Sequence, residues 1–306
     1  RRPEAELIGS LPTGSGKIGT LLTQVGKRLW AGPLVGAGEL ASLGTTADGL
    51  IVAAATKGKR VKVELLREPA ANQRKVVVAG CDPAMFLAAE HARTRDAGEI
   101  VPFLMGSGMA LDALKRGEVH VAGVHFADEN SAEILADLKR QLGKVDCVVV
   151  TFAHWEEGVL VRAGNPKNIR STSDLVKPTV TIVNREQGSG ARRLLDRQLE
   201  AAGIPGRRVK GYGVEVSSHL DVAWRVEAGL ADAGIGVRAA AAIRGLDFVP
   251  LQRGRYDLII SKTHYKSLPG FKILFDTIVG AAFRSELEAH GGYDTRDIGR
   301  DVLPAN

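Results

Sequence analysis

IVPFLMGSGMALDALKRGEVHVAGVHF, residues 100–126, carries the alternation that decides the fold of this chain. An apolar run ends in a turn at Gly106, a helical pattern of apolar residues follows, and Gly117 stands just past the end of that pattern. A second apolar run then begins at Val119. The stretch therefore predicts a strand, a glycine-bearing turn, a helix and another strand.

The same order of elements recurs on both sides of this stretch. KVVVAG (75–80) precedes a helical pattern in which Asp82 is a candidate cap, and TVTIVN (179–184) precedes a helical pattern that ends at Gly203. Strands that alternate with helices predict parallel sheets with helices on both faces, and two consecutive sets predict an α/β fold with two lobes and a cleft. We also expect a helix at 131–143, strands at 246–251 and 256–262, and a mainly helical tail at 268–290.

Residues 1–70 follow a different pattern. Short alternating or β-branched runs, among them ADGLIVA (47–53) and KGKRVKVELL (57–66), are separated by glycine pairs and predict a small all-β domain. The polar segment 67–74 carries a proline and predicts a linker. The α/β part is expected to span 74–306.

The composition excludes several classes of protein. With 306 residues, 44% of them hydrophobic and 25% charged, the chain is expected to fold into two or three domains. No apolar run approaches the roughly 18–20 residues of a membrane span, and the first residues lack the apolar core of a secretory signal. The net charge of +6 suits an anionic ligand, but the basic residues are scattered and aromatics make up only 5%, which argues against nucleic acid.

Two glycine-serine turns are the strongest candidates for a ligand site. Residues 105–108 (MGSG) and 187–192 (QGSGAR) stand at equivalent positions, where a strand leads into a helix. The N–H groups and dipole of a helix N-terminus favour negative charge there, by about 0.3–1 kcal/mol when exposed. Plain N-capping by the serines is the alternative for either turn alone. The candidate ligand residues of the two turns are Ser107, Gly108, Gly188, Ser189, Gly190 and Ala191.

Three further side chains are candidates for contact with an anion. Arg185 and Arg192 flank the second turn, and either guanidinium could pair with an oxyanion; a solvated surface position is the alternative for both. His125 follows a strand, where loops of α/β folds place functional groups. For His125, as for His219 near the start of a helix, a structural hydrogen bond is the alternative.

Catalytic and metal chemistry have little support in the sequence. No nucleophile elbow occurs in its structural context, and Cys81 has no basic partner nearby. The glycine-rich turns match neither the dinucleotide nor the P-loop pattern. His154, Glu156 and Glu157 lack a third ligand at helical spacing and lie between two expected strands. We therefore predict no catalytic residues, no metal and no cofactor in this chain.

From about residue 74 onward, the chain resembles the periplasmic-binding-protein-like domain associated with molybdate-responsive regulators and molybdenum-cofactor proteins. The resemblance rests on GSGMALDALKRGEVHVAGVHF (106–126), VNREQGSGARRLLDRQLEAAGI (183–204), GYGVEVSSHLDVAWRVEAGLADAGIG (211–236), LDFVPL (246–251) and YDLIISK (256–262).

This resemblance implies a two-lobed, type-II periplasmic-binding-protein-like fold. Lobe 1 would comprise about 74–155 and 257–306, and lobe 2 about 156–256. The crossover strands would lie near 151–158 and 255–259.

Residues 1–70 are similar to the small C-terminal β-domain of molybdopterin molybdenumtransferase, the enzyme that inserts molybdenum into molybdopterin. ADGLIVA followed by KGKRVKVELL carries that likeness. It implies that the chain is the tail of a longer fusion, which agrees with a first residue other than Met, and that the part in hand is not catalytic alone. It also implies a cytoplasmic location, and homodimers, which are common among molybdenumtransferases.

The chain departs from the family pattern at two places. The first loop carries Cys81-Asp82 where such domains usually have Ser-Asp, which removes a candidate hydroxyl ligand. Arg253-Gly254-Arg255 stands where an acidic residue is common, which predicts a more basic cleft mouth.

Three functions remain open from the sequence. The first is a binding module that closes on a small oxyanion, molybdate or tungstate, held between the two glycine-serine turns. The second is a scaffold or interaction part of a molybdenumtransferase fusion without its own ligand. The third is a binder of a larger pterin or nucleotide phosphate, for which Phe126, Trp155 or Tyr212 could offer an aromatic face. Trp224 lies in an apolar helical pattern and is expected in the core. Neither a membrane nor nucleic acid is an expected partner.

Overall fold

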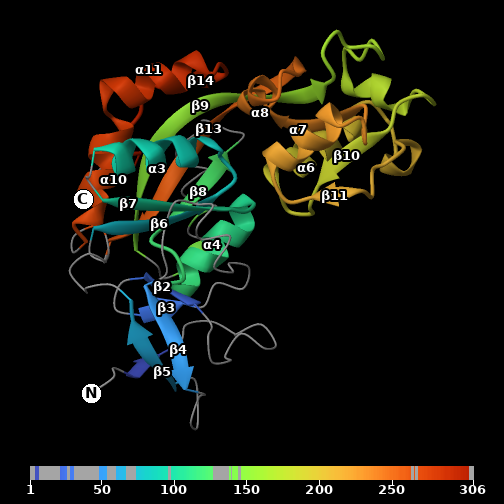
Figure 1. The fold of residues 1–306 in the computed structure, drawn as a ribbon. Coiled ribbons are helices and arrows are strands. Elements are labelled where there is room, and N and C mark those ends of the chain that lie inside the picture. The colour runs from blue at the N-terminus through green and yellow to red at the C-terminus, as the bar shows by residue number, and fades with distance from the viewer. Residues whose placement is uncertain are drawn as a thin grey trace.

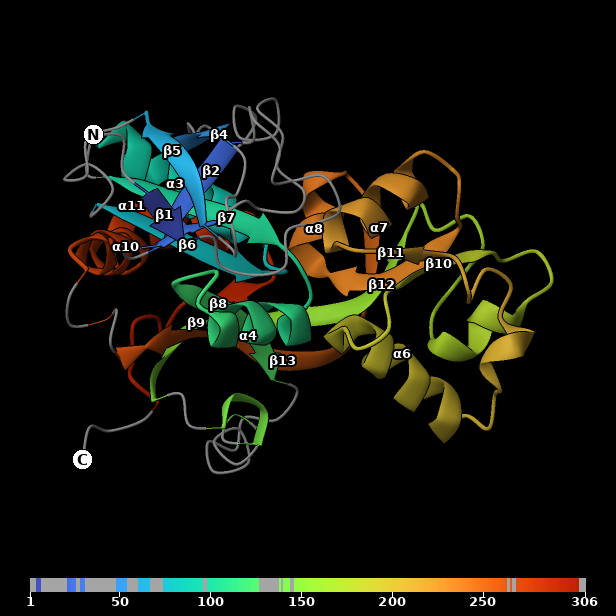
Figure 2. The same ribbon diagram turned by 90° about the horizontal axis from the view of Figure 1, so that it is seen from below.

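A computed structural model shows the chain folded around two separate β-sheets (Figure 1 and Figure 2). Two elements expected from the sequence lie outside the described residues: the linker at 67–74, apart from Arg74, and most of the helix at 131–143. The structure describes residues 4–6, 21–25, 28–30, 48–53, 60–66, 74–95, 98–126, 138, 140–143, 146–262, 265 and 268–302.

The described part of the N-terminal segment forms an antiparallel sheet, drawn in blue at the bottom of Figure 1. The strand order is β1-β5-β4-β2-β3. Its strands are β1 (Glu4–Glu6), β2 (Leu21–Val25), β3 (Arg28–Trp30), β4 (Gly49–Ala53) and β5 (Arg60–Leu65).

The α/β part is built on one mixed sheet of nine strands. The order is β11-β10-β12-β9-β13-β8-β6-β7, and β14 adds to β9. Strands β6, β7 and β8 are parallel in one lobe, and β10, β11 and β12 are parallel in the other. Their bounds are β6 (Lys75–Gly80), β7 (Glu99–Leu104), β8 (Val121–Phe126), β9 (Cys147–Val161), β10 (Ile182–Arg185), β11 (Glu215–Val216), β12 (Ala233–Val237), β13 (Asp247–Ser261) and β14 (Tyr293–Asp294).

Strands β9 and β13 run through both lobes. Each has 15 residues, and the two pair antiparallel along their whole length. In lobe 1, β13 pairs with β8, and in lobe 2, β9 pairs with β12. The crossings expected near 151–158 and 255–259 lie within these two strands. At about 3.3 Å per residue, each strand is roughly 50 Å long, enough to belong to both lobes.

The structure corrects the strand assignments in this region. The stretches 246–251 and 256–262, expected as two strands, belong almost entirely to β13. The segment around His154 lies inside β9 and not in a loop. The pairing register shifts between Pro250 and Gln252 and again between Tyr256 and Asp257, so bulges absorb the proline and the bend within one strand.

Helices cover both faces of the sheet (Figure 1). The helices of lobe 1 are α3 (Ala84–Thr94), α4 (Ser107–Arg116), α10 (Gly270–Ile278) and α11 (Ala281–Ala289). Lobe 2 has α6 (Gly190–Ala201), α7 (His219–Glu227), α8 (Arg238–Ile243) and the 3-10 turns η1 (Thr172–Val176) and η2 (Gly206–Arg208). None of the helices in the described ranges has the length and apolar character needed to span a membrane.

Strand β6 shows why this sequence forms a doubly covered sheet. Val76 and Val78 pack into the apolar cluster that includes α3 and α10, whereas Val77 and Ala79 pack into the cluster that includes α4. Alternate residues of a strand point to opposite faces, so an uninterrupted apolar run is buried on both sides. The two-lobed α/β fold predicted from the sequence is confirmed.

A buried ion pair joins the N-terminal segment to lobe 1. The Lys75 ammonium, at the start of β6, contacts the Asp48 carboxylate, and these side chains are 1% and 0% exposed. The backbone N–H of Leu66 donates to the Asp48 carbonyl (2.9 Å). Because two opposite charges are buried together, each is needed to offset the desolvation of the other.

We predict that Lys75→Met lowers the free energy of unfolding by about 3–5 kcal/mol, since it removes the cation that balances a buried carboxylate. Urea denaturation measures the change. The double variant Asp48→Asn/Lys75→Met should recover most of the loss. Lys272→Met is the matched control, because it breaks an exposed pair with Asp276 and should cost less than about 1 kcal/mol. Equal losses for the two lysine variants would contradict the prediction.

Candidate functional site

The two glycine-serine turns meet at the interface between the lobes. A Cβ atom placed on Gly106, in the turn before α4, would lie 2.7 Å from Oε1 of Glu186 and 3.8 Å from Cβ of Ser189. A Cβ atom on Gly190, at the start of α6, would lie 2.9 Å from Nδ1 of His125. The missing side chains of these glycines therefore permit the close approach of the lobes.

The serine hydroxyls of both turns are engaged within the protein. Ser107 Oγ accepts from the backbone N–H of His125 (3.1 Å). Ser189 Oγ accepts from the N–H of Arg192 (3.2 Å) and donates to the carbonyl of Glu186 (2.9 Å). The first-turn N–H groups of α4 and α6 have no carbonyl partner within their own helices. These turns therefore offer backbone N–H groups to a ligand, and the O–H of Ser107, whose oxygen only accepts in the contact above, is also able to donate.

Aromatic rings from both lobes converge beside the turns. Trp155 lies near the middle of β9, and its ring centroid is 5.2 Å from that of His125, 5.8 Å from that of His219 and 4.7 Å from that of Tyr256. His125, expected after a strand, is the penultimate residue of β8 in lobe 1, whereas His219 begins α7 in lobe 2. The indole of the crossing strand is thus packed between the two lobes.

Four buried side chains here carry polar atoms without a hydrogen-bond partner. They are Trp155 (Nε1), Arg185 (Nη1), His125 (Nε2) and His219 (Nδ1), which we call the interlobe cluster. A buried polar group without a partner costs about 1–3 kcal/mol. Trp155, Arg185 and His219 therefore provide hydrogen-bonding capacity that a ligand bound between the lobes would satisfy. Nε2 of His125 instead lies on the side of the ring that faces Gly254 and Glu157.

Arg185 is the cation of the interlobe cluster. Its Nε and Nη2 donate to the carboxylate of Glu186 (2.7 and 2.9 Å), and Nη2 also donates to the carbonyl of Ser217 (3.1 Å). These contacts hold the guanidinium plane in place and leave Nη1 buried without a partner. A guanidinium fixed in this way is suited to an oxyanion, because little rotamer freedom remains to be lost on binding.

The titratable groups around Arg185 are shifted toward their neutral forms. Burial, and next Arg185, holds the pKa of His219 well below its usual value. Burial also lowers the pKa of His125, against the opposing effect of Glu157, whose Oε2 lies 3.4 Å from Nε2. Burial raises the pKa of the Cys81 thiol to about 12. Both imidazoles are therefore neutral at neutral pH, and Cys81 is not a thiolate nucleophile.

The loop after β6 is held by two tyrosines. The Tyr293 hydroxyl donates to Oδ1 of Asp82 (2.7 Å), and the backbone N–H of Asp82 donates to the Tyr256 oxygen (3.4 Å). The Tyr256 hydroxyl lies where the side chains of Gly80 and Gly123 would be. These contacts fix the loop that carries the departure from the family pattern, and Tyr256 connects it to Trp155.

The other predicted site residues differ in whether they are buried, exposed or directed into lobe 2. Ala191 is buried in the first turn of α6, beside the interface, whereas Gly108 and Gly188 are exposed. Arg192 points into lobe 2: its guanidinium contacts Asp196 (3.2 Å), Glu215 (2.9 Å) and the Arg185 carbonyl (3.3 Å), and lies 4.2 Å from the centroid of the Tyr212 ring. Arg192 therefore supports the second turn from within lobe 2.

Two expectations about individual residues are wrong. Trp224, expected in the core, is 46% exposed and lines a groove of about 500 Å³ on lobe 2, because α7 buries its other face. Of the stretch Arg253-Gly254-Arg255, expected to make the cleft mouth basic, Arg255 does not contribute, because it is buried and paired with Asp257 (2.9 Å), whereas Arg253 is exposed. Its neighbour Gly254 instead makes room for the His125 ring, which a Cβ atom there would overlap.

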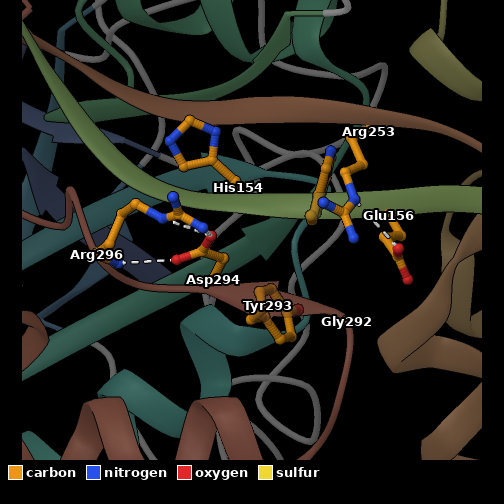
Figure 3. Close-up of a pocket in the computed structure, with 8 residues that line it drawn as sticks. His154, Glu156, Arg253, Gly292, Tyr293, Asp294 and Arg296 are labelled. Atoms are coloured by element: carbon orange, nitrogen blue, oxygen red, sulfur yellow. Dashed lines mark hydrogen bonds and ion pairs between the residues drawn. The ribbon is translucent and has the colours of Figure 1, made fainter.

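A second cavity, of about 280 Å³, lies beside the crossing strands (Figure 3). His154 and Glu156 alternate with Trp155 along β9, so these two side chains point to the opposite face of the sheet. Glu156 binds Arg238 of lobe 2 and Arg253 of β13, and its N–H donates to the Gly292 carbonyl (3.2 Å). The cavity is lined by His154, Trp155, Glu156, Arg253, Gly292, Tyr293, Asp294 and Arg296.

Two residues of the site, Tyr256 and Tyr293, carry no recognisable signal in the sequence, because they reach Asp82 from more than 170 positions away. Trp155 was foreseen only as an aromatic face for a larger ligand. The Gly291-Gly292 pair before Tyr293 was the one available signal. Both glycines have positive φ, and a Cβ atom on Gly292 would lie 2.6 Å from Cβ of Arg238.

Among the described residues, no group of three or more His, Cys, Asp or Glu side chains is arranged to hold a metal ion. The geometry provides fixed donors from both lobes, one buried guanidinium and neutral imidazoles. It is suited to holding a small polar molecule by hydrogen bonds.

A two-lobed α/β fold with partnerless buried polar groups between its lobes defines a hinged ligand-binding domain. The chain belongs to the periplasmic-binding-protein (PBP) superfamily: the model of the PBP superfamily domain matches residues 88–279. The uncharacterized protein YvgK of Bacillus subtilis (strain 168) is 31% identical over 230 residues, which cover 74% of this chain and 73% of that protein. An uncharacterized protein encoded in the 5′ region of a 2Fe-2S ferredoxin gene of Clostridium pasteurianum is 41% identical over 110 residues, 36% of this chain and 96% of that protein.

Solved structures show the same fold at low sequence identity. A candidate phosphate ABC transporter substrate-binding protein with bound phosphate, from Clostridium perfringens, has a TM-score of 0.55 and 11% identity, and the match covers 72% of this chain and 99% of that chain. The sulfate-binding protein SubI of Mycobacterium tuberculosis H37Rv has a TM-score of 0.50 and 20% identity over 72% of this chain and 86% of that chain.

We predict that Gly190→Ala hinders lobe closure. The added methyl would meet the His125 ring, which cannot retreat because Gly254 lies against its other side. Small-angle scattering should give a larger radius of gyration for this variant than for Gly108→Ala, which adds the same methyl to the opposite turn in open space. Identical scattering from the two variants would show that these turns are not in contact in solution.

Proposed function

We propose that this chain is a binding module that closes its lobes around a small oxyanion. The observation that carries the proposal is the buried Nη1 of Arg185, which has no partner and lies at the lobe interface with the indole N–H of Trp155. Two donors of this kind, one of them cationic, match the oxygens of an anion that bridges the lobes.

Helix N-termini support an anion over a neutral ligand. Helices α4, α6 and α7 begin at the lobe interface, and the hydroxyl of Ser218 caps α7 as that of Ser189 caps α6. Their first-turn N–H groups and dipoles favour negative charge, and more strongly when water is excluded. Bound phosphate in one structural relative and the sulfate-binding name of another agree with this ligand class.

We propose molybdate or tungstate as the anion, on the basis of the sequence resemblance to molybdate-responsive and molybdenum-cofactor proteins. On the same basis we propose that the chain works in the cytoplasm, as a dimer, beside a molybdenumtransferase-like β-domain within residues 1–70. There it would store, sense or deliver the anion for molybdenum insertion.

The aromatic residues argue against a larger pterin or nucleotide ligand. Phe126 is part of the lobe 1 core, and Tyr212 lies under the guanidinium of Arg192. Trp155 is buried against three other rings. An interface with partnerless polar groups also argues against a scaffold without a ligand, whose interlobe space would be filled by apolar side chains.

Calorimetric titration with molybdate, tungstate, sulfate and phosphate tests the proposal. We expect one site per chain and the tightest binding for molybdate or tungstate. Equal affinity for all four would reject the molybdenum assignment and keep the oxyanion class. No binding of any of them would reject the function.

Arg185→Gln should weaken binding of the preferred anion by roughly 10- to 150-fold, because a charged hydrogen bond contributes about 1.5–3 kcal/mol. Arg193→Gln is the matched control, since it removes an equal charge from an exposed position on α6. Circular dichroism verifies that both variants fold. Equal losses for the two would show that Arg185 acts only through long-range charge.

A further inference from the structure

We propose that Asp82 is a ligand residue of the interlobe site that carries a proton on Oδ2 when the anion binds. Binding of a fully deprotonated oxyanion would then take up one proton from solvent. This inference rests on the proposed function and adds to it a proton-linked residue that the two glycine-serine turns did not suggest.

The hydrogen bonds of Asp82 assign a separate role to each carboxyl oxygen. Oδ1 accepts from the Ala84 N–H (2.8 Å) and from the Tyr293 hydroxyl (2.7 Å). Oδ2 has no partner, although the side chain is fully buried. A proton on Oδ1 would displace one of its two donors, so Oδ2 is the oxygen that can hold one.

The position of Asp82 directs it toward the lobe interface. Asp82 follows β6 in the loop before α3, and its N–H donates to the Tyr256 hydroxyl oxygen. The Tyr256 ring packs at a tilt of 42° against Trp155 of the interlobe cluster. After burial, the charge with the largest effect on the pKa of the adjacent Cys81 thiol is that of Arg185 in lobe 2. The loop and the guanidinium therefore lie within electrostatic range of each other across the interface.

The groups around Asp82 favour its protonated form. Burial raises its pKa to about 6, against the opposing hydrogen bonds from Tyr293 and Ala84. Tyr256 and Tyr293, which face it from β13 and β14, are themselves neutral, because burial holds their pKa well above the usual value.

The charges on the remaining elements do not reverse this preference. Cys81 on the same loop is a neutral thiol. Arg185, the last residue of β10, is ion-paired with the next residue, Glu186. Glu157 on β9 adds a negative charge that also acts on Cys81. A bound dianion would add more negative charge and raise the pKa of Asp82 further.

The proton balance of the step is simple. A solvent proton adds to a lone pair of Oδ2, and the resulting O–H donates to an oxygen of the anion. No bond within the anion forms or breaks. The binding of each anion is thus accompanied by the uptake of at most one proton. The affinity for the anion falls as the pH rises above the pKa that Asp82 has in the ligand-free protein.

Calorimetry with sodium molybdate, sodium tungstate and sodium sulfate, in buffers of different ionisation enthalpy, measures this uptake. From a pKa of about 6, we expect close to one proton per anion at about pH 7.5 and roughly a quarter of a proton at about pH 5.5. Between pH 7 and pH 8 the affinity should fall about tenfold.

The variant Asp82→Asn distinguishes a proton-carrying ligand residue from one that only holds the loop in place. The amide keeps the Oδ1 acceptor for Tyr293 and Ala84 and supplies a permanent donor in place of the protonated Oδ2. The variant should bind the anion without proton uptake and with an affinity that is flat between pH 6 and pH 8.

Asp257→Asn is the matched control. The pKa of this buried carboxyl is also raised to about 6, chiefly by burial, but its partner is Arg255 and it lies on the other face of the crossing strands. Its replacement should leave the proton uptake unchanged.

The outcomes are distinct from those of the proposed function. Binding without proton uptake, or uptake that survives in Asp82→Asn, would overturn the role of Asp82 and leave the oxyanion function standing. If none of these three anions nor phosphate bound, both proposals would fail.

Discussion

The full-length antiparallel pairing of β9 with β13 is the interaction on which the rest of the structure depends. It makes one continuous ladder of backbone hydrogen bonds, to which β8 adds in lobe 1 and β12 in lobe 2. The parallel strands of each lobe extend the sheet outward from this pair of strands. Their carboxyl ends, where the glycine-serine turns stand, are brought to the same interface. Trp155 and Gly254 face each other across the ladder, at the point where the lobes meet.

At the lobe interface the two lobes lie close together, but several buried polar atoms have no hydrogen-bond partner. Glycines at the two turns and at Gly254 allow backbone and rings to approach closely. The interlobe cluster nevertheless keeps four polar atoms without partners. Each such atom disfavours closure in the absence of a ligand, and an anion that satisfies them would favour it. The energy of closure would in this way be linked to anion binding.

The C-terminal segment connects the loop after β6, which carries Asp82, to lobe 2. Tyr293 binds Asp82 of lobe 1, and Gly292 packs directly against Arg238 of lobe 2, which also binds Glu156 of the crossing strand. A larger residue than glycine at position 292 would separate these contacts. The cavity in Figure 3 lies beside this connection and is lined by Gly292 and Tyr293 as well as by residues of β9.

The sequence by itself determined the fold and the position of the turns, because apolar runs, helix caps and glycines are local signals whose meaning does not depend on distant residues. It did not determine which side chains meet at the lobe interface. Arg185 and Arg192 look alike beside the second turn, yet the first keeps a buried N–H without a partner and the second is saturated within lobe 2. Only tertiary packing decides this, since Trp155, Tyr256, Tyr293 and Asp82 are brought together by long-range pairing of strands whose order in space the local pattern does not encode.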